Sequence, residues 1–193
     1  RHQRHALPPD ALREARGLMN QAFEHDPNGI YLAWSSMIRM VQLMESSASN
    51  QAELLEEAVD LQYRAMDLAA DNPLVHAIVS KVRSTAFGEI SGPLDSAKTA
   101  VERNPASAYA WKSLADAELL AGNLDKAFAA SHRACRLAHS SPFRHWWDTG
   151  HCIIAIACKR MDEAIDAGES AARSAPLSPP ALRHLLALYA LQG

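Results

Sequence analysis

Two groups of histidine, cysteine and acidic side chains are the residues of this sequence best suited to chemistry. In the first, His132, Cys135 and His139 follow one another at intervals of three and four residues, so on a helix they share one face. This spacing is compatible with a metal site, because zinc takes nitrogen and sulfur ligands. No second cluster supplies further obvious ligands. We therefore expect a solvated histidine pair beside a small buried cysteine.

The second group, Asp148, His151 and Cys152, contains the residue types of a nucleophilic triad. Adjacent residues on a helix point about 100° apart, so His151 cannot easily face Cys152. The glycines of the sequence are isolated, and none follows a strand in the manner of a phosphate-binding loop. We therefore predict no catalytic residue, no cofactor and no metal, and we expect that the chain is not an enzyme.

The elements that carry these residues are expected to be helices around a packed core. Hydrophobic residues make up 48% of the sequence and charged residues 21%, which argues against disorder. The hydrophobic share is rich in Ala and Leu, which favour helix. A net charge of −3 gives no sign of the basic patch that nucleic-acid modules carry, so we expect no direct nucleic-acid binding.

The apolar runs and the cysteines indicate in which cellular compartment the protein is expected. The longest apolar run, Cys152–Cys158, is too short to cross a bilayer, so we expect no membrane contact. Three cysteines form an odd number, which disfavours a disulfide framework and favours a reducing cytoplasm. The chain begins at Arg1 without an initiator methionine, and we expect it to be part of a longer protein.

Small residues recur in pairs seven apart, which is about two helical turns. The pairs are Ala15–Ala22, Ala58–Ala65, Pro93–Ala100, Ala127–Ala134 and Ala164–Ala171. Their second members are separated by 43, 35, 34 and 37 residues, and a period near 34 is typical of tetratricopeptide arrays. The longest interval predicts a polar loop around Ser46–Asn50, and the 37-residue interval places extra residues near Ser140–Pro142. Each loop is a tolerated insertion or a binding feature.

The clearest unit begins near Ala108 with Trp111 and Leu114, has Gly122 at its turn, and resembles a tetratricopeptide repeat (TPR). The resemblance implies an all-α, right-handed superhelix of antiparallel helical hairpins with about ten helices. The expected helices are 10–25, 30–45, 51–69, 74–87, 93–103, 107–121, 124–138, 144–158, 161–174 and 180–191. The expected domain organisation is a single array over 1–193, with a half repeat 1–27, full repeats at about 28–70, 71–105, 106–141 and 142–176, and a terminal first helix at 177–193.

The resemblance also implies a binding groove on the concave side, which the first helices of such hairpins line. The groove residues carried over to this sequence are Lys81, Ser84, Tyr109, Lys112, Asp116, Trp146, Thr149, Ile153 and Arg183. Some of these residues could instead only pack against a neighbouring helix. The family's clamp for carboxylate-ended peptides is disfavoured, because Asp116 stands where an Asn is expected and would repel a carboxylate.

The stretch from Asn104 to Gly193 is similar to the C-terminal repeat regions of bacterial winged-helix transcriptional regulators and of adenylate or guanylate cyclases. The matching features are Ser141–Arg144, Asp148 and Pro179–Arg183. This similarity implies a regulatory scaffold that binds a partner protein or peptide, another copy of itself, or an effector domain of the same chain. The alternatives are a small-molecule sensor and the regulatory region of a cyclase.

An apolar stripe of Leu182, Leu185, Leu186 and Tyr189 predicts a partly buried terminal helix that contacts a second copy.

Overall fold

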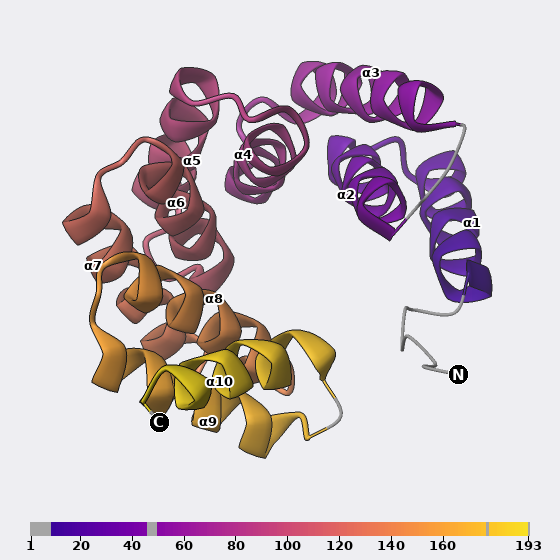
Figure 1. The fold of residues 1–193 in the computed structure, drawn as a ribbon. Helices are drawn as coiled ribbons and strands as arrows, with labels where there is room; N and C mark the ends of the chain where they lie inside the picture. The colour runs from indigo at the N-terminus through magenta and orange to yellow at the C-terminus, as the bar shows by residue number, and fades with distance from the viewer. Residues whose placement is uncertain (1–8, 46–49, 177, 193) are drawn as a thin grey trace. The chain divides into compact units, whose positions relative to one another are not determined.

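The computed structural model describes residues 9–45, 50–176 and 178–192, and these ranges are built from helices without a strand. They contain ten helices, which are labelled in Figure 1. They are α1 (Pro9–His25), α2 (Gly29–Glu45), α3 (Gln51–Ala69), α4 (Pro73–Phe87), α5 (Ser91–Arg103), α6 (Ala108–Leu120), α7 (Leu124–Leu137), α8 (Arg144–Ala157), α9 (Met161–Ser174) and α10 (Pro179–Gln192). The all-α prediction is confirmed, with helix ends within two residues of those expected. The predicted polar loop lies mostly at 46–49, outside the described residues.

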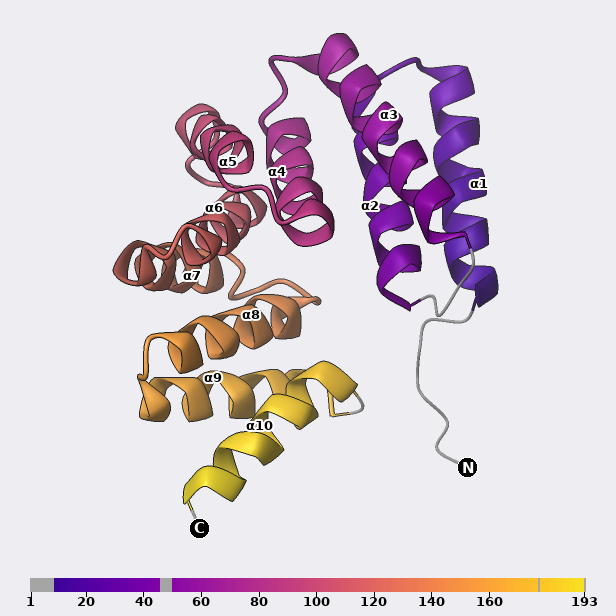
Figure 2. The same ribbon diagram turned by 45° about the horizontal axis from the view of Figure 1, so that its top comes forward.

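The chain divides into two compact units, Arg1–Ala100 and Val101–Gly193, with the boundary inside α5. In the first unit α2 packs against α1, α3 and α4, and α3 also packs against α4. In the second unit α6 pairs with α7 and α8 pairs with α9, while α7 packs on α8 and α10 covers parts of α8 and α9. Figure 2 shows the α6–α7 and α8–α9 pairs running antiparallel. Each unit is therefore a stack of helical hairpins.

Side-chain caps begin two of the first helices. The Asn72 side chain accepts a hydrogen bond from the Leu74 backbone N–H at 2.9 Å, and Pro73 occupies the first position of α4. The Ser107 hydroxyl accepts from the Ala110 N–H at 3.1 Å at the start of α6. These bonds satisfy backbone donors that a helix N-terminus leaves unpaired.

Each hairpin turn of the second unit contains one residue with a left-handed backbone conformation. Gly122 supplies it between α6 and α7 with φ 77°, a conformation that costs glycine nothing. Lys159 occupies the corresponding turn between α8 and α9 and also has a positive φ, 58°, which is unfavourable for a residue with a Cβ atom. The α8–α9 hairpin therefore keeps the same turn geometry without the residue that best suits it.

Alanines lie where the paired helices cross. The fully buried alanines are Ala65, Ala127, Ala134, Ala164 and Ala171, and Ala58 is 2% exposed. The prediction that Ala127 and Ala134 are buried between paired helices is confirmed. Two helices approach closely only where the side chains between them are small, so these positions fix the spacing within each hairpin.

The last helix, α10, is anchored by a residue that the predicted stripe omitted. Leu188 is 2% exposed and packs with Cys152 and Ala164, whereas Leu186 is 67% exposed. Leu182 and Leu185 are half-buried. The stripe is therefore partly buried on the preceding hairpin, as expected, and its contact with a second copy stays a prediction. No helix in the described ranges is both long and apolar enough to span a membrane.

Candidate functional site

The first helices of the second unit bring six predicted groove residues onto two adjoining helix faces. Tyr109, Lys112 and Asp116 follow one another on α6 at helical spacing, and Trp146, Thr149 and Ile153 do so on α8. We refer to these six residues as the α6–α8 surface. Their faces meet at one point, where the Lys112 side chain of α6 lies against Gly150 of α8.

Gly150 is what allows this approach. A Cβ atom at position 150 would overlap Cε of Lys112 and would lie 3.1 Å from its Nζ. The absence of a side chain lets the lysine stem lie flat over α8. Its ammonium then donates to the Asp116 carboxylate at 2.6 Å, as predicted from their four-residue spacing. Lys112 is thus fixed at both its stem and its charged end.

The ion pair is partly buried. The side chains of Lys112 and Asp116 are 20% and 15% exposed, so the pair is partly shielded from water. Burial raises the pKa of Tyr109, and the nearby Asp116 carboxylate raises this pKa further. Trp146 and Ile153 are 62% and 38% exposed. Large exposed aromatic side chains are enriched in the surfaces through which proteins bind one another.

Of the other three predicted groove residues, two belong to the first unit and one to α10. Lys81 and Ser84 belong to α4 of the first unit, and Ser84 is buried with its hydroxyl donating to the Ser80 carbonyl at 2.8 Å. Arg183 is exposed on α10. Ser84 thus serves helix packing in this structure, and a place for all nine residues on one concave groove stays a prediction.

A separate cleft of about 410 Å³ lies between α7 and α9, with α8 as its floor. We refer to it as the α7–α9 cleft. It gathers most of the residues that the sequence marked as chemically capable. Its lining is His132, Cys135, Arg136, His139, Arg144, Asp148, His151, Glu163, Asp166, Ala167 and Ser170. Among the described residues, no three histidine, cysteine or acidic side chains are placed to hold a metal ion.

Asp148 ties the three helices of the cleft together. It is 4% exposed, and its carboxylate accepts hydrogen bonds from Arg144 Nε at 3.1 Å and from the Ser170 hydroxyl at 2.7 Å. The Cys135 thiol also bonds to Asp148, and burial together with this carboxylate raises the pKa of the thiol to about 12. The thiol is therefore protonated and unsuited to nucleophilic attack.

His151 is held in one orientation by α7. The Ser131 hydroxyl donates to the Phe128 carbonyl at 2.9 Å, and its oxygen also forms a hydrogen bond with His151 Nδ1 at 2.7 Å. The other ring nitrogen, Nε2, has no hydrogen-bond partner among the described residues. Burial lowers the pKa of His151, and the neighbouring His132 lowers this pKa further. The ring is therefore neutral near pH 7.

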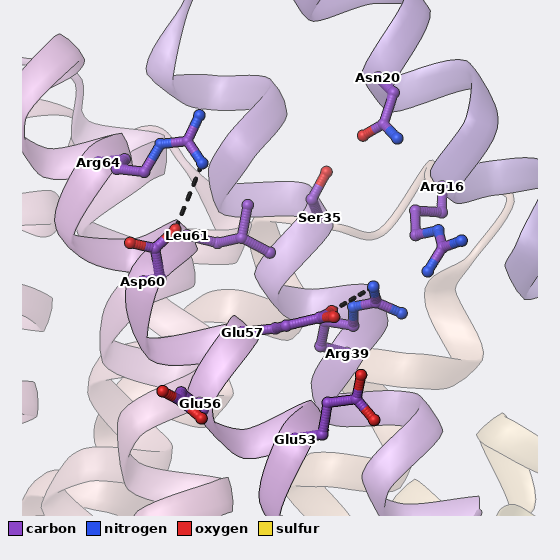
Figure 3. Close-up of a pocket in the computed structure, with 10 residues that line it drawn as sticks. All are labelled: Arg16, Asn20, Ser35, Arg39, Glu53, Glu56, Glu57, Asp60, Leu61 and Arg64. Carbon is purple, nitrogen blue, oxygen red and sulfur yellow. Dashed lines mark hydrogen bonds and ion pairs between the residues drawn. The ribbon is translucent and has the colours of Figure 1, made fainter. Parts of the chain in front are cut away.

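The first unit has a groove of related design, about 590 Å³ in volume, between α1 and α3 over α2 (Figure 3). We refer to it as the α1–α3 groove. Its α3 wall is acidic, but two of its carboxylates are occupied by the chain itself. Glu57 forms an ion pair with Arg39 of α2, and Asp60 accepts from Arg64 at 3.3 Å (Figure 3).

Neither depression was predicted from the sequence, because the groove residues were taken from the first helices alone and His132, Cys135 and His139 were treated as a possible metal site. A signal was present. In α3, Glu57 stands immediately before Ala58 and Asp60 stands two residues after it. In α9, Glu163 and Asp166 stand at the same two positions around Ala164. Repetition of charge at one repeat position marks a shared surface of the second helices.

Comparisons with known proteins identify the fold. No protein-family model matches the sequence, and no curated protein matches it. Among solved structures, TTC0263, a thermophilic TPR protein of Thermus thermophilus, aligns with a TM-score of 0.70 and 17% identity over 92% of this chain and 90% of that chain. YrrB, described as a TPR protein with an unusual peptide-binding site, aligns with a TM-score of 0.54 and 17% identity over 90% of this chain and 83% of that chain. The hairpin stack is therefore the TPR fold.

Proposed function

We propose that this chain is a scaffold that binds a protein or peptide through the α6–α8 surface. The proposal is carried by the exposed indole of Trp146, four residues before Gly150 on α8, together with Lys112, which lies against Gly150 and pairs with Asp116. Binding energy at protein interfaces concentrates in a few aromatic and charged anchors. Because the lysine is already ordered, little side-chain entropy is lost when a partner contacts it.

The chemistry of the surface defines the kind of partner. Trp146 and Ile153 lie two turns apart on α8 and offer apolar contact. Lys112 and Asp116 offer one donor group and one acceptor group between α6 and α8. A peptide segment with an apolar side chain flanked by polar groups matches this arrangement. YrrB, which shares the fold, is described as binding a peptide at an unusual site, and this description supports the same class of ligand here.

We further propose that the scaffold serves as the regulatory part of a bacterial signalling protein, foremost a transcriptional regulator in the cytoplasm. The support is the sequence similarity over Ser141–Arg144 and Pro179–Arg183. In this setting the partner is another protein, a second copy, or an effector domain of the same chain. The repeat region of a nucleotide cyclase is the alternative setting. A catalytic role and a small-molecule sensor have less support, since the described thiols all have raised pKa values and the α7–α9 cleft is mostly charged.

Selection of binding peptides tests the proposal. A random peptide library displayed on phage is panned on the whole chain, and the affinities of the selected peptides are measured by fluorescence anisotropy. Trp146→Ala should weaken binding by roughly thirtyfold, as loss of a central aromatic anchor does. The matched control is Tyr63→Ala, because Tyr63 on α3 has nearly the same exposure, 61%.

A second matched pair sharpens the result. Ile153→Ala should weaken binding by several-fold, while Leu124→Ala on α7, with 39% exposure against 38%, should not change it. Peptides that bind equally well to the wild type and to both α8 variants would place the binding site elsewhere and refute the proposal.

A further inference from the structure

The second helices α3, α7 and α9 share a repeat position, four residues after the first alanine of each pair. In α7 this position is Ser131, which forms a hydrogen bond with His151 of the following helix at 2.7 Å. In α9 it is Gly168, where a Cβ atom would lie 3.2 Å from Cδ1 of Leu185 on α10. In the second unit this position is therefore in contact with the next first helix. In α3 the same position is Gln62.

Gln62 is buried without a partner for its amide nitrogen. The residue is only 5% exposed, and its Nε2 atom has no hydrogen-bond partner among the described residues. The NH2 group of a glutamine is a donor of two hydrogen bonds. A buried donor that makes none of them is unfavourable unless a bound molecule supplies an acceptor. The α3 position thus lacks the contact that α8 provides to Ser131.

A pocket of about 80 Å³ lies beside this amide, between α3 and α4. We refer to it as the α3–α4 pocket. Gln62 lines it together with Glu89, which follows α4. Its apolar walls include Val59 of α3 and Val79 and Phe87 of α4. Sites for whole small molecules have volumes of about 300–1,000 Å³. The α3–α4 pocket is therefore of a size for one side chain.

We propose that the α3–α4 pocket binds a glutamine side chain of a partner protein. The carbonyl oxygen of that side chain accepts from Gln62 Nε2, its methylene groups lie against the apolar walls, and its NH2 group donates to Glu89. Glu89 has room for this bond, because one nitrogen of Arg83 contacts both of its oxygens, at 2.9 and 3.2 Å, and a carboxylate has about four acceptor sites. A carboxamide carries both donors and an acceptor, so it pairs with the Gln62 amide in either of its two orientations.

Other side chains match the pocket less well. A glutamate has no donor, and the Glu89 carboxylate repels it. Arginine and lysine have donors but no acceptor for Gln62. A hydroxyl group offers its acceptor and its donor from a single oxygen, and an aliphatic side chain leaves the buried amide unsatisfied. The α3–α4 pocket belongs to the first unit and the α6–α8 surface to the second, so neither proposal depends on the other.

The test uses capped glutamine, Nα-acetyl-glutamine N-methylamide, titrated into the whole chain. The readout is the carbon–proton NMR spectrum of the valine methyl groups, in which Val59 and Val79 are assigned by their loss in Val59→Ile and Val79→Ile. Both signals should shift saturably with capped glutamine, and neither should shift with capped glutamate or capped leucine. The absence of a saturable shift with capped glutamine, or an equal shift with capped leucine, would overturn the proposal.

Three variants locate the binding. Gln62→Leu keeps the size of the side chain and removes its donor, so it should weaken the binding of capped glutamine by roughly tenfold. Its stability in urea should not fall, because an unpaired buried donor is replaced by an apolar group. Gln21→Leu makes the same change at an exposed position of α1 outside the pocket and should bind as the wild type does.

The third variant, Glu89→Gln, changes the selectivity of the pocket. It removes the negative charge and supplies a donor, so capped glutamate should now shift the Val59 and Val79 signals. Unchanged binding of capped glutamine by Gln62→Leu, or no binding of capped glutamate by Glu89→Gln, would refute the assignment.

Discussion

Three glycine-to-alanine substitutions separate the packing role of glycine from its effect on helix stability. At Gly17 in α1, a Cβ atom would meet nothing within 4 Å. Alanine is favoured over glycine in a helix by about 0.5–1 kcal/mol. Gly17→Ala should therefore stabilise the protein by that amount, and it serves as the reference for the other two substitutions.

Gly29→Ala should have the opposite sign. Gly29 is buried at the start of α2, where a Cβ atom would overlap the Ala65 carbonyl oxygen and lie 2.8 Å from the Ala69 Cβ. Two carbon atoms at rest are about 3.5–4.0 Å apart, so α2 and α3 would have to separate by roughly 1 Å. Overpacking of this kind costs about 1–3 kcal/mol, and the small gain in helix propensity at a first position does not offset it.

Gly150→Ala should fall between these two. The atoms in its way belong to the far end of the flexible Lys112 side chain. This side chain can rotate away at the cost of its pairing with Asp116, which is worth about 0.3–0.5 kcal/mol for an i,i+4 pair. The helix gain of about 0.5–1 kcal/mol covers that loss. The fold should stay as stable as the wild type, while Lys112 leaves the α6–α8 surface.

Urea unfolding followed by far-UV circular dichroism measures all three free energies of unfolding. The expected order of stability is Gly17→Ala, then Gly150→Ala close to the wild type, then Gly29→Ala. A Gly29→Ala variant as stable as Gly17→Ala would refute the reasoning, because it would mean that α2 and α3 are not in close contact at that point.

Three further predictions concern single positions in the second unit. Ala127→Leu should destabilise the fold by about 1–3 kcal/mol because it overpacks a fully buried crossing, whereas Ala129→Leu on the exposed face of α7 should stay within about 0.5 kcal/mol of the wild type in the same urea assay. Lys159→Gly should stabilise the α8–α9 turn by about 1 kcal/mol, since the positive φ then costs nothing; a loss of stability in thermal unfolding would contradict this. Burial lowers the pKa of His151 below its usual 6.5 in the folded protein. As the pH falls, the unfolded chain therefore binds a proton before the folded protein does. The stability present above pH 6.5 should be lost as the pH drops toward the pKa of His151 in the folded protein. His151→Gln should show a shallower loss in unfolding measured from about pH 7 to about pH 5, and identical slopes for the two proteins would count against a buried neutral ring.

The sequence by itself determined the class of fold and the position of every helix in the described residues. Paired alanines such as Ala127 and Ala134 indicate a helix crossing because only small side chains fit there. The four-residue spacing of Lys112 and Asp116 was enough to predict their ion pair, because neighbours on a helix surface are fixed by its period. These inferences are local or periodic, so they need no knowledge of which helices meet.

Only the tertiary structure decided which chemically capable residues lie together. His132, Cys135, Asp148 and His151 looked like two separate groups in the sequence, and the packing of α7 on α8 places them in one cleft. That packing brings His151 to Ser131, twenty residues away, and the pairing of α8 with α9 brings Asp148 to Ser170, twenty-two residues away. Helix periodicity gives the face on which a side chain lies, but the neighbour of that face depends on contacts between distant segments, which the pattern of one segment does not contain.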